Sequence, residues 1–203
     1  MHKVAQVPAP RIRRQSTRSH LSASHVVRPA HAGDIAAIHA IVRRYAAQGA
    51  MLPRTRRDIG ATIDDYVVVV DGHRRVLACA ALAGYSPVLA EVSSVAVAKS
   101  AQGQGLGTMA VRGVEALARE RGILELFAMT TAEAFFESLG YDRSSVEQYP
   151  EKLARYEMLR AAGVEVIERS CYRKLFSEAD RARAAQVPPR QQPRRRAARR
   201  TAG

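Results

Sequence analysis

The first part of the chain carries apolar residues at the spacing of one helix face. They are Ile35, Ile38, Ile41, Val42 and Tyr45. Asp34 precedes this face and Gly49 follows it, as expected for the start and the end of a helix. Thr55 is placed to cap a second, shorter helix that runs through Ile59 to Ile63. The pattern therefore predicts two helices, which follow a short strand at Val26 and Val27.

Strand patterns dominate the middle of the chain. Tyr66 to Val70 is a β-branched run, Asp71-Gly72 is a hairpin signal, and Val76 to Ala83 supplies the returning strand. A further strand, Leu89 to Val97, comes after Ser86-Pro87. We expect these three strands to be consecutive and antiparallel.

Helices and strands alternate in the second half. In order, the pattern predicts a helix from Leu106 to Gly122, a strand from Ile123 to Met129, a helix through Phe135 and Phe136, a strand opened by Gly140-Tyr141, a helix from Pro150 through Met158, and a closing strand from Val164 to Phe176. The strands before and after the first of these helices should lie side by side in parallel. The fold class is therefore α/β (α+β), with a mixed, mostly antiparallel sheet.

A glycine-rich turn joins the last antiparallel strand to the helix after it. Its sequence is Gln102-Gly103-Gln104-Gly105-Leu106-Gly107, with glycine at every second position. Glycine permits positive φ and a close approach to a ligand. The amides of the turn and of the helix start can converge on one point, where the helix dipole adds positive potential. The turn suits a phosphate or pyrophosphate, and a tight turn without a ligand is the alternative.

Composition changes this picture mainly at the two ends of the chain. The net charge of the 203 residues is +13, of which residues 1–24 contribute five and residues 178–203 six. Both segments are too polar to fold alone, so we expect two disordered basic tails around one domain at residues 25–177. A transit peptide is an alternative interpretation of residues 1–24.

The class of protein is further limited by what the sequence lacks. No run of about 18 apolar residues is present, so we expect no membrane span and a cytoplasmic protein. Cys79 and Cys171 show no metal-ligand spacing, so we expect no metal. Charge alone gives non-specific, salt-sensitive nucleic-acid binding. A nucleic-acid-binding protein that works through its tails therefore remains only as a non-enzyme alternative, and a homodimer is left open.

Two patterns resemble the signatures of the GNAT superfamily of N-acetyltransferases. Gln102-x-x-Gly105-x-Gly107 matches its Gln/Arg-x-x-Gly-x-Gly/Ala acyl-CoA motif. The run from Phe135 to Tyr141 resembles its aromatic pair followed by Gly-aromatic. The resemblance covers about residues 26–176. It implies a central mixed sheet with helices on both faces, one parallel strand pair that splays apart, and acetyl-CoA as co-substrate.

A finer resemblance is to the acetyltransferase domain of short-form N-acetylglutamate synthases. It rests on five blocks, Leu52-Pro53-Arg54, Cys79-Ala80-Ala81-Leu82, Ala90-Glu91-Val92, Leu126-Phe127-Ala128-Met129-Thr130-Thr131 and Tyr149-Pro150-Glu151-Lys152. The resemblance implies acetyl transfer to the α-amine of an amino acid, with L-glutamate as the first candidate. The family's closing Arg-x-Ser-Lys block is altered here, where the counterpart is the run from Arg169 to Lys174. Another acceptor, such as a peptide N-terminus, a lysine or a small amine, therefore stays an alternative.

The resemblance also assigns the cofactor site. The pyrophosphate would be held by the backbone of Gln102, Gly103, Gln104, Gly105, Leu106, Gly107 and Thr108. Freed N–H groups at the end of the preceding strand would polarise the thioester oxygen and stabilise the tetrahedral intermediate. These groups belong to Val95, Ala96 and Val97.

Proton transfer and acceptor recognition need side chains. An α-ammonium group must lose a proton before it attacks, and Glu91 is the candidate base, with an exposed strand acid as the alternative. The general acid is Tyr141 or Tyr85, unless the incoming amine or solvent protonates the thiolate.

Carboxylate recognition favours arginine, because its planar fork pairs with both carboxylate oxygens. Arg54 is the first candidate, and Arg169 and Ser170 are the second. Thr130, with Thr131 beside it, could contact either substrate, or could cap the next helix.

Overall fold

The computed structural model describes residues 24–177 together with Ala179 and Ala182. Nearly all of the two predicted tails, residues 1–24 and 178–203, lies outside these described residues. The division of the chain into one domain and two tails therefore stays a prediction.

The strands of the described chain form one seven-stranded sheet in the order β1-β2-β3-β4-β5-β7-β6. Their bounds are β1 Val26–Pro29, β2 Tyr66–Val70, β3 Val76–Gly84, β4 Leu89–Val97, β5 Glu125–Thr130, β6 Asp142–Ser144 and β7 Ser170–Leu175. Neighbouring strands are antiparallel except for β4 and β5, which are parallel. The predicted mixed, mostly antiparallel sheet is confirmed.

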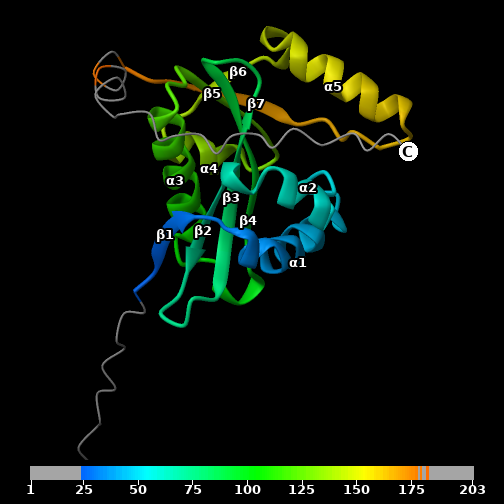
Figure 1. Cartoon of the computed structure of the whole chain (residues 1–203). Coiled ribbons are helices and arrows are strands. Elements are labelled where there is room, and N and C mark those ends of the chain that lie inside the picture. The colour runs from blue at the N-terminus through cyan, green and yellow to red at the C-terminus, as the bar shows by residue number, and fades with distance from the viewer. Residues whose placement is uncertain (1–23, 178, 180–181, 183–203) are drawn as a thin grey trace, which may run out of the picture.

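Helices cover both faces of the sheet. Their bounds are α1 Ile35–Ala46, α2 Arg56–Ala61, α3 Leu106–Glu120, α4 Glu133–Ser138 and α5 Pro150–Ala161. Figure 1 shows α1 and α2 on one side of the sheet, α3 and α4 on the other, and α5 apart from both pairs beside β7. In the described part of the chain, none of the helices is long and apolar enough to cross a membrane.

Strand β2 shows why both faces need a helix layer. All five of its residues are buried. Val67 and Val69 join the core beneath α3, whereas Val68 and Val70 join the core beneath α1. Successive strand residues point to opposite faces, so a continuous apolar strand is stable only when both faces are covered.

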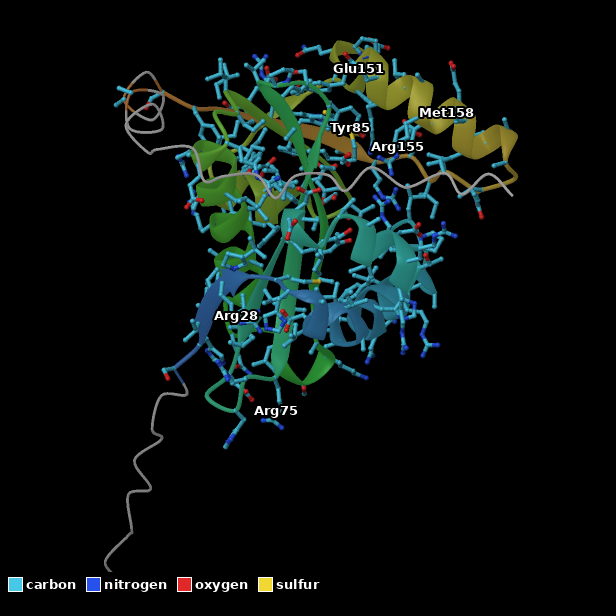
Figure 2. The ribbon with its side chains drawn as sticks, in the orientation of Figure 1. Arg28, Arg75, Tyr85, Glu151, Arg155 and Met158 are labelled. Carbon is cyan, nitrogen blue, oxygen red and sulfur yellow. The ribbon has the colours of Figure 1, made fainter. Side chains whose placement is uncertain are left out.

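The start of α1 is tied to the edge strand β1 by an ion pair. The Arg28 guanidinium contacts both carboxylate oxygens of Asp34, at 2.7 and 2.8 Å. Asp34 is buried, and Arg28 lies on β1 in Figure 2. The residue that the sequence marks as a helix start therefore also anchors the strand that precedes it.

Several predicted boundaries are wrong, among them the start of the strand predicted from Ile123, which begins at Glu125. The closing strand starts at Ser170 instead of Val164, because its partner β5 ends at Thr130, opposite Ser170. The second helix ends at Ala61, short of Ile63. Its predicted start is confirmed, since the Thr55 hydroxyl accepts a hydrogen bond from the Asp58 N–H at 3.1 Å.

Candidate active site

The parallel strands β4 and β5 separate soon after they meet. Their register pairs run from Leu89↔Glu125 to Glu91↔Phe127 and then stop. Strand β4 nevertheless continues to Val97. Backbone groups of β4 that point toward β5 beyond Glu91 therefore have no partner in that strand. The two strands thus leave an opening between them beyond Glu91, the β4–β5 opening.

A bulge at Ser94 bends β4 just after it leaves β5. Cys79 pairs with Ala96 and Ala81 pairs with Ser93, so β4 carries one residue more than β3 between these pairs. Ser94 has a φ of 53°, in the left-handed region that few residues other than glycine adopt. The Tyr66 hydroxyl lies 3.4 Å from the Ser94 hydroxyl. The sequence gives no signal for this bulge.

The three glycines of the turn are required for different structural reasons. Gly103 and Gly105 have positive φ values of 76° and 74°, and Gly105 is the cap residue directly before α3. Gly107 lies within the first turn of α3, where an added Cβ would stand 3.5 Å from the Phe135 ring. No side chain caps the start of α3. Its first N–H groups thus remain available to an anion.

The other residues of the predicted cofactor site frame this turn. Gln102 and Gln104 are exposed, Thr108 is half-buried, and Leu106 is buried in the core, so it can offer only its backbone N–H. In β4, Ala96 faces the core under α1, and Val95 and Val97 pack against the core under α3.

Glu91 belongs to a buried ion pair. The Lys152 ammonium on α5 contacts its two carboxylate oxygens at 2.7 and 2.8 Å, and the Tyr85 hydroxyl donates to one of them at 2.9 Å. The side chains of Lys152 and Glu91 are only 5% and 8% exposed. The alternative of an exposed strand acid is therefore wrong. Sequence reasoning gave Lys152 no role.

Burial shifts the acid–base properties of this group. It lowers the pKa of Lys152, and although Glu91 opposes this shift, the neighbouring cations Arg155 and Arg54 add to it. The pKa of Tyr85 is raised well above its usual value by burial and by the Glu91 carboxylate. Tyr85 therefore keeps its proton over the whole neutral range.

The ion pair lies in the wall of a pocket of about 70 Å³ on the α1 and α2 side of the sheet. The lining consists of Ala50, Met51, Leu52, Arg54, Glu91, Ser93, Ser94, Met129, Lys152, Arg155, Tyr156 and Arg169. Four of these side chains are cationic and one is a carboxylate. Figure 2 shows Arg155 on the side of α5 nearest to Tyr85, whereas Met158 points away from the body of the molecule. The pocket is thus suited to an anionic ligand that also carries an ammonium group.

The structure brings some of the predicted acceptor residues together and separates others. Arg54 and Arg169 line the pocket with Glu91. Ser170 does not, because its hydroxyl donates to the Glu133 carboxylate on α4. The Thr130 hydroxyl accepts a hydrogen bond from the Ala132 N–H at 2.9 Å, directly before α4. This contact agrees with the alternative that Thr130 caps the next helix. Ser170 and Thr130 thus hold α4 in place.

Tyr141 lies away from the pocket. It is 2% exposed, and its ring packs edge-on against Phe136 in the core beneath α3. Its hydroxyl is shielded from solvent, and burial together with Glu115 raises its pKa far above the usual value. A general acid must reach the leaving group, so this position corrects the expectation for Tyr141. Tyr85, the other candidate, contacts Glu91.

Metal-binding side chains do not gather in the described part of the chain. Within residues 24–177, no three or more His, Cys, Asp or Glu side chains are placed to hold a metal ion. Cys79 and Cys171 are both free and buried.

Known proteins resemble this chain over the same region. It is 36% identical over 134 residues to an uncharacterised N-acetyltransferase of Chlorobaculum tepidum. This match covers 66% of this chain and 86% of the relative. It is 30% identical to the amino-acid acetyltransferase of Pectobacterium atrosepticum over 73% of this chain, but the match spans only 34% of that protein. Thus the chain covers about a third of the length of such enzymes.

A solved structure shows the same fold with ligands. N-acetylglutamate synthase from Neisseria gonorrhoeae, complexed with coenzyme A and N-acetyl-glutamate, superposes with a TM-score of 0.66 at 27% identity. The match covers 76% of this chain and 36% of that one. Residues 36–141 also match the Acetyltransferase (GNAT) family, which is more than half of the chain. The parallel strand opening, the glycine turn and these matches together show that the chain belongs to the GNAT family of acetyltransferases.

Proposed function

We propose that this acetyltransferase transfers the acetyl group of acetyl-CoA to the α-amine of L-glutamate. The observation that carries the proposal is the cationic pocket, whose wall includes Arg54, Arg155 and Arg169 and which lies beside the β4–β5 opening. A site for acyl-CoA and a site for a dicarboxylate are then adjacent.

The cofactor half of the proposal rests on the turn. Backbone N–H groups from Gln102 to Thr108 would bind the pyrophosphate, because the start of α3 is uncapped and its dipole favours anions. Of the last three β4 residues, Val95 and Val97 direct their N–H groups away from β3 and would hydrogen-bond the thioester oxygen, whereas the N–H of Ala96 faces Cys79 on β3. The related N-acetylglutamate synthase, which binds coenzyme A, supports this assignment.

The acceptor half rests on charge and geometry. Glutamate carries two carboxylates and one ammonium group at neutral pH. Arg54, Arg155 and Arg169 offer planar guanidinium groups for the carboxylates, and Glu91 is the carboxylate among the pocket-lining residues that can attract the ammonium. The pocket would therefore favour a dicarboxylic amino acid over a lysine side chain or a polyamine, both of which the cations repel.

During the reaction the acceptor nitrogen loses two protons and the sulfur of coenzyme A gains one. The α-ammonium loses a proton to Glu91, which acts as a pair with Lys152, and the free amine attacks the thioester carbon. The nitrogen of the resulting tetrahedral intermediate loses its second proton to solvent, the C–S bond breaks, and coenzyme A leaves as a thiolate that takes up a proton. Tyr85 is the candidate donor for this proton, and direct protonation by the amine or by solvent is the alternative.

Another acceptor amine is the second candidate. The closing block on β7 has Tyr172 and Arg173 directly before Lys174. It therefore departs from the Arg-x-Ser-Lys block of the N-acetylglutamate synthases that the chain resembles. Peptide N-termini, lysines and small amines keep the same cofactor site and change only the acceptor.

The experiment that separates these acceptors follows release of coenzyme A from acetyl-CoA. Release is expected with glutamate, and at most weakly with lysine peptides or polyamines. Equal or greater release with a peptide or polyamine would refute the proposed acceptor and leave the cofactor assignment standing.

Replacing Arg54 by alanine should raise the KM for glutamate about 10- to 100-fold, the loss expected for hydrogen bonds to a charged group. The KM for acetyl-CoA should change little, because Arg54 lies on the acceptor side. Arg57→Ala is the matched control, since Arg57 is exposed on α2, only three positions after Arg54, and does not line the pocket. Equal glutamate KM values for the two variants would exclude Arg54 from acceptor binding.

A further inference from the structure

We propose that Tyr45 is a positioning residue that couples the acetyl-CoA turn to the acceptor pocket. The inference rests on the proposed function, because it assumes acyl-CoA at the turn and the acceptor in the pocket. It adds a residue that the sequence motifs do not indicate, since Tyr45 enters the sequence pattern only as an apolar position of a helix.

The hydroxyl of Tyr45 reaches the cofactor side. It donates a hydrogen bond to the Val97 carbonyl at 2.7 Å, and it accepts one from the side-chain amide of Gln102 at 2.8 Å. Val97 ends β4, and Gln102 opens the glycine turn. A single hydroxyl thus fixes the strand end relative to the turn, across 52 and 57 positions of sequence respectively.

The backbone of Tyr45 reaches the acceptor side. Its carbonyl accepts hydrogen bonds from the N–H groups of Gln48 and Ala50, at 3.1 and 3.0 Å, where α1 ends. Ala50 is the first residue of the segment that lines the pocket and leads to Arg54. The pocket arginine Arg169 donates to the Gly49 carbonyl in this same segment, at 3.2 Å.

The ring of Tyr45 makes this connection stiff. It is half-buried and packs against the core beneath α1, which includes Ile38 and Val42. A ligand that orders Gln102 and Val97 would therefore also restrict Tyr45, and with it the start of the acceptor wall. Two sites that bias one element are coupled, and the coupling is reciprocal for binding free energies.

The test replaces Tyr45 by phenylalanine, which keeps the ring and removes both hydroxyl contacts. Titration calorimetry with coenzyme A should show a dissociation constant about 5- to 30-fold higher, the range for one or two net hydrogen bonds. The wild-type protein should bind glutamate more tightly when coenzyme A is present. That gain should shrink in Tyr45→Phe, while glutamate binding without coenzyme A stays unchanged.

Two further variants separate positioning from stability. Gln102→Ala removes one of the contacts at an exposed position, and its effect should not add to that of Tyr45→Phe in the double variant. Tyr149→Phe removes a comparable hydroxyl contact, to Glu125 at 2.7 Å, and should lower the melting temperature without changing affinity for coenzyme A.

The outcomes distinguish the coupling from the function. A wild-type protein that does not bind coenzyme A would overturn the proposed function and the coupling together. Binding by the wild type with unchanged affinity and unchanged coupling in Tyr45→Phe would overturn the role of Tyr45 alone. Additive effects of Tyr45→Phe and Gln102→Ala would also contradict the proposed link.

Discussion

Replacing Lys152 by methionine is expected to destabilise the protein by about 3–5 kcal/mol, the typical cost of removing one partner of a buried ion pair. The Glu91 carboxylate would stay buried and would keep the hydrogen bond from the Tyr85 hydroxyl but lose both of those from Lys152. Removal of its cation leaves an uncompensated charge, and this desolvation cost exceeds what a surface pair contributes. Urea unfolding at neutral pH measures the change in the free energy of unfolding.

Two control variants make this expectation specific. Arg143→Met breaks the exposed pair with Glu133, in which Arg143 is 72% exposed, and should cost no more than about 1 kcal/mol. The double variant Glu91→Gln with Lys152→Met removes both charges and should be more stable than Lys152→Met alone. If Lys152→Met destabilised the protein no more than Arg143→Met does, the pair would not be a buried constraint on α5.

The same pair separates stability from chemistry. Glu91→Gln keeps the shape of the side chain and removes the proposed proton acceptor. A folded Glu91→Gln protein should therefore be slower and should change the pH profile of kcat/KM. An unaltered rate and profile would remove Glu91 as the base, whatever the variant does to stability.

Replacing Gly105 by valine is expected to abolish detectable binding of coenzyme A. Gly105 has a φ of 74°, which is strained for a β-branched residue, and it is the cap residue directly before α3. A change of its conformation would turn the first N–H groups of α3 away from a common point. Calorimetric titration with coenzyme A measures the loss.

Two glycines supply the controls for this substitution. Gly122 follows the other end of the same helix, has a φ of 75° and has open space around it, so Gly122→Val imposes a similar strain away from the turn. It should lower stability and spare binding. Gly107→Ala should be milder than Gly105→Val, because its added Cβ would make only ordinary contacts with Phe135. Retained binding in Gly105→Val would refute the role of the turn.

Most of the fold could be predicted from local patterns. The apolar period of α1, the Asp71-Gly72 hairpin and the connection through α3 each report on neighbours in sequence, and all three are confirmed. The closing strand predicted from Val164 is too long at its start, because the true start depends on where β5 ends. That information is not present in the strand's own sequence.

The site was less predictable, because side-chain partners come from distant segments. Lys152 lies 61 positions from Glu91, and nothing near either residue indicates the ion pair. Conversely, Tyr141 follows a family motif, yet its side chain points into the core. A motif identifies a backbone position, whereas the face to which a side chain points depends on the packed structure. For Arg54 the motif and the packed structure agree, since the residue that the motif indicates also lines the pocket.

The most direct test of the central claim compares glutamate with glutamine as acceptors. The two differ by one carboxylate, which the cations of the pocket are proposed to recognise. We expect acetyl transfer to glutamate, verified by the mass of N-acetylglutamate, with a kcat/KM at least about 10-fold above that for glutamine, as expected when a charged hydrogen bond is lost. Equal kcat/KM values, or no acetylated glutamate, would contradict the proposal that this pocket binds a dicarboxylic amino acid.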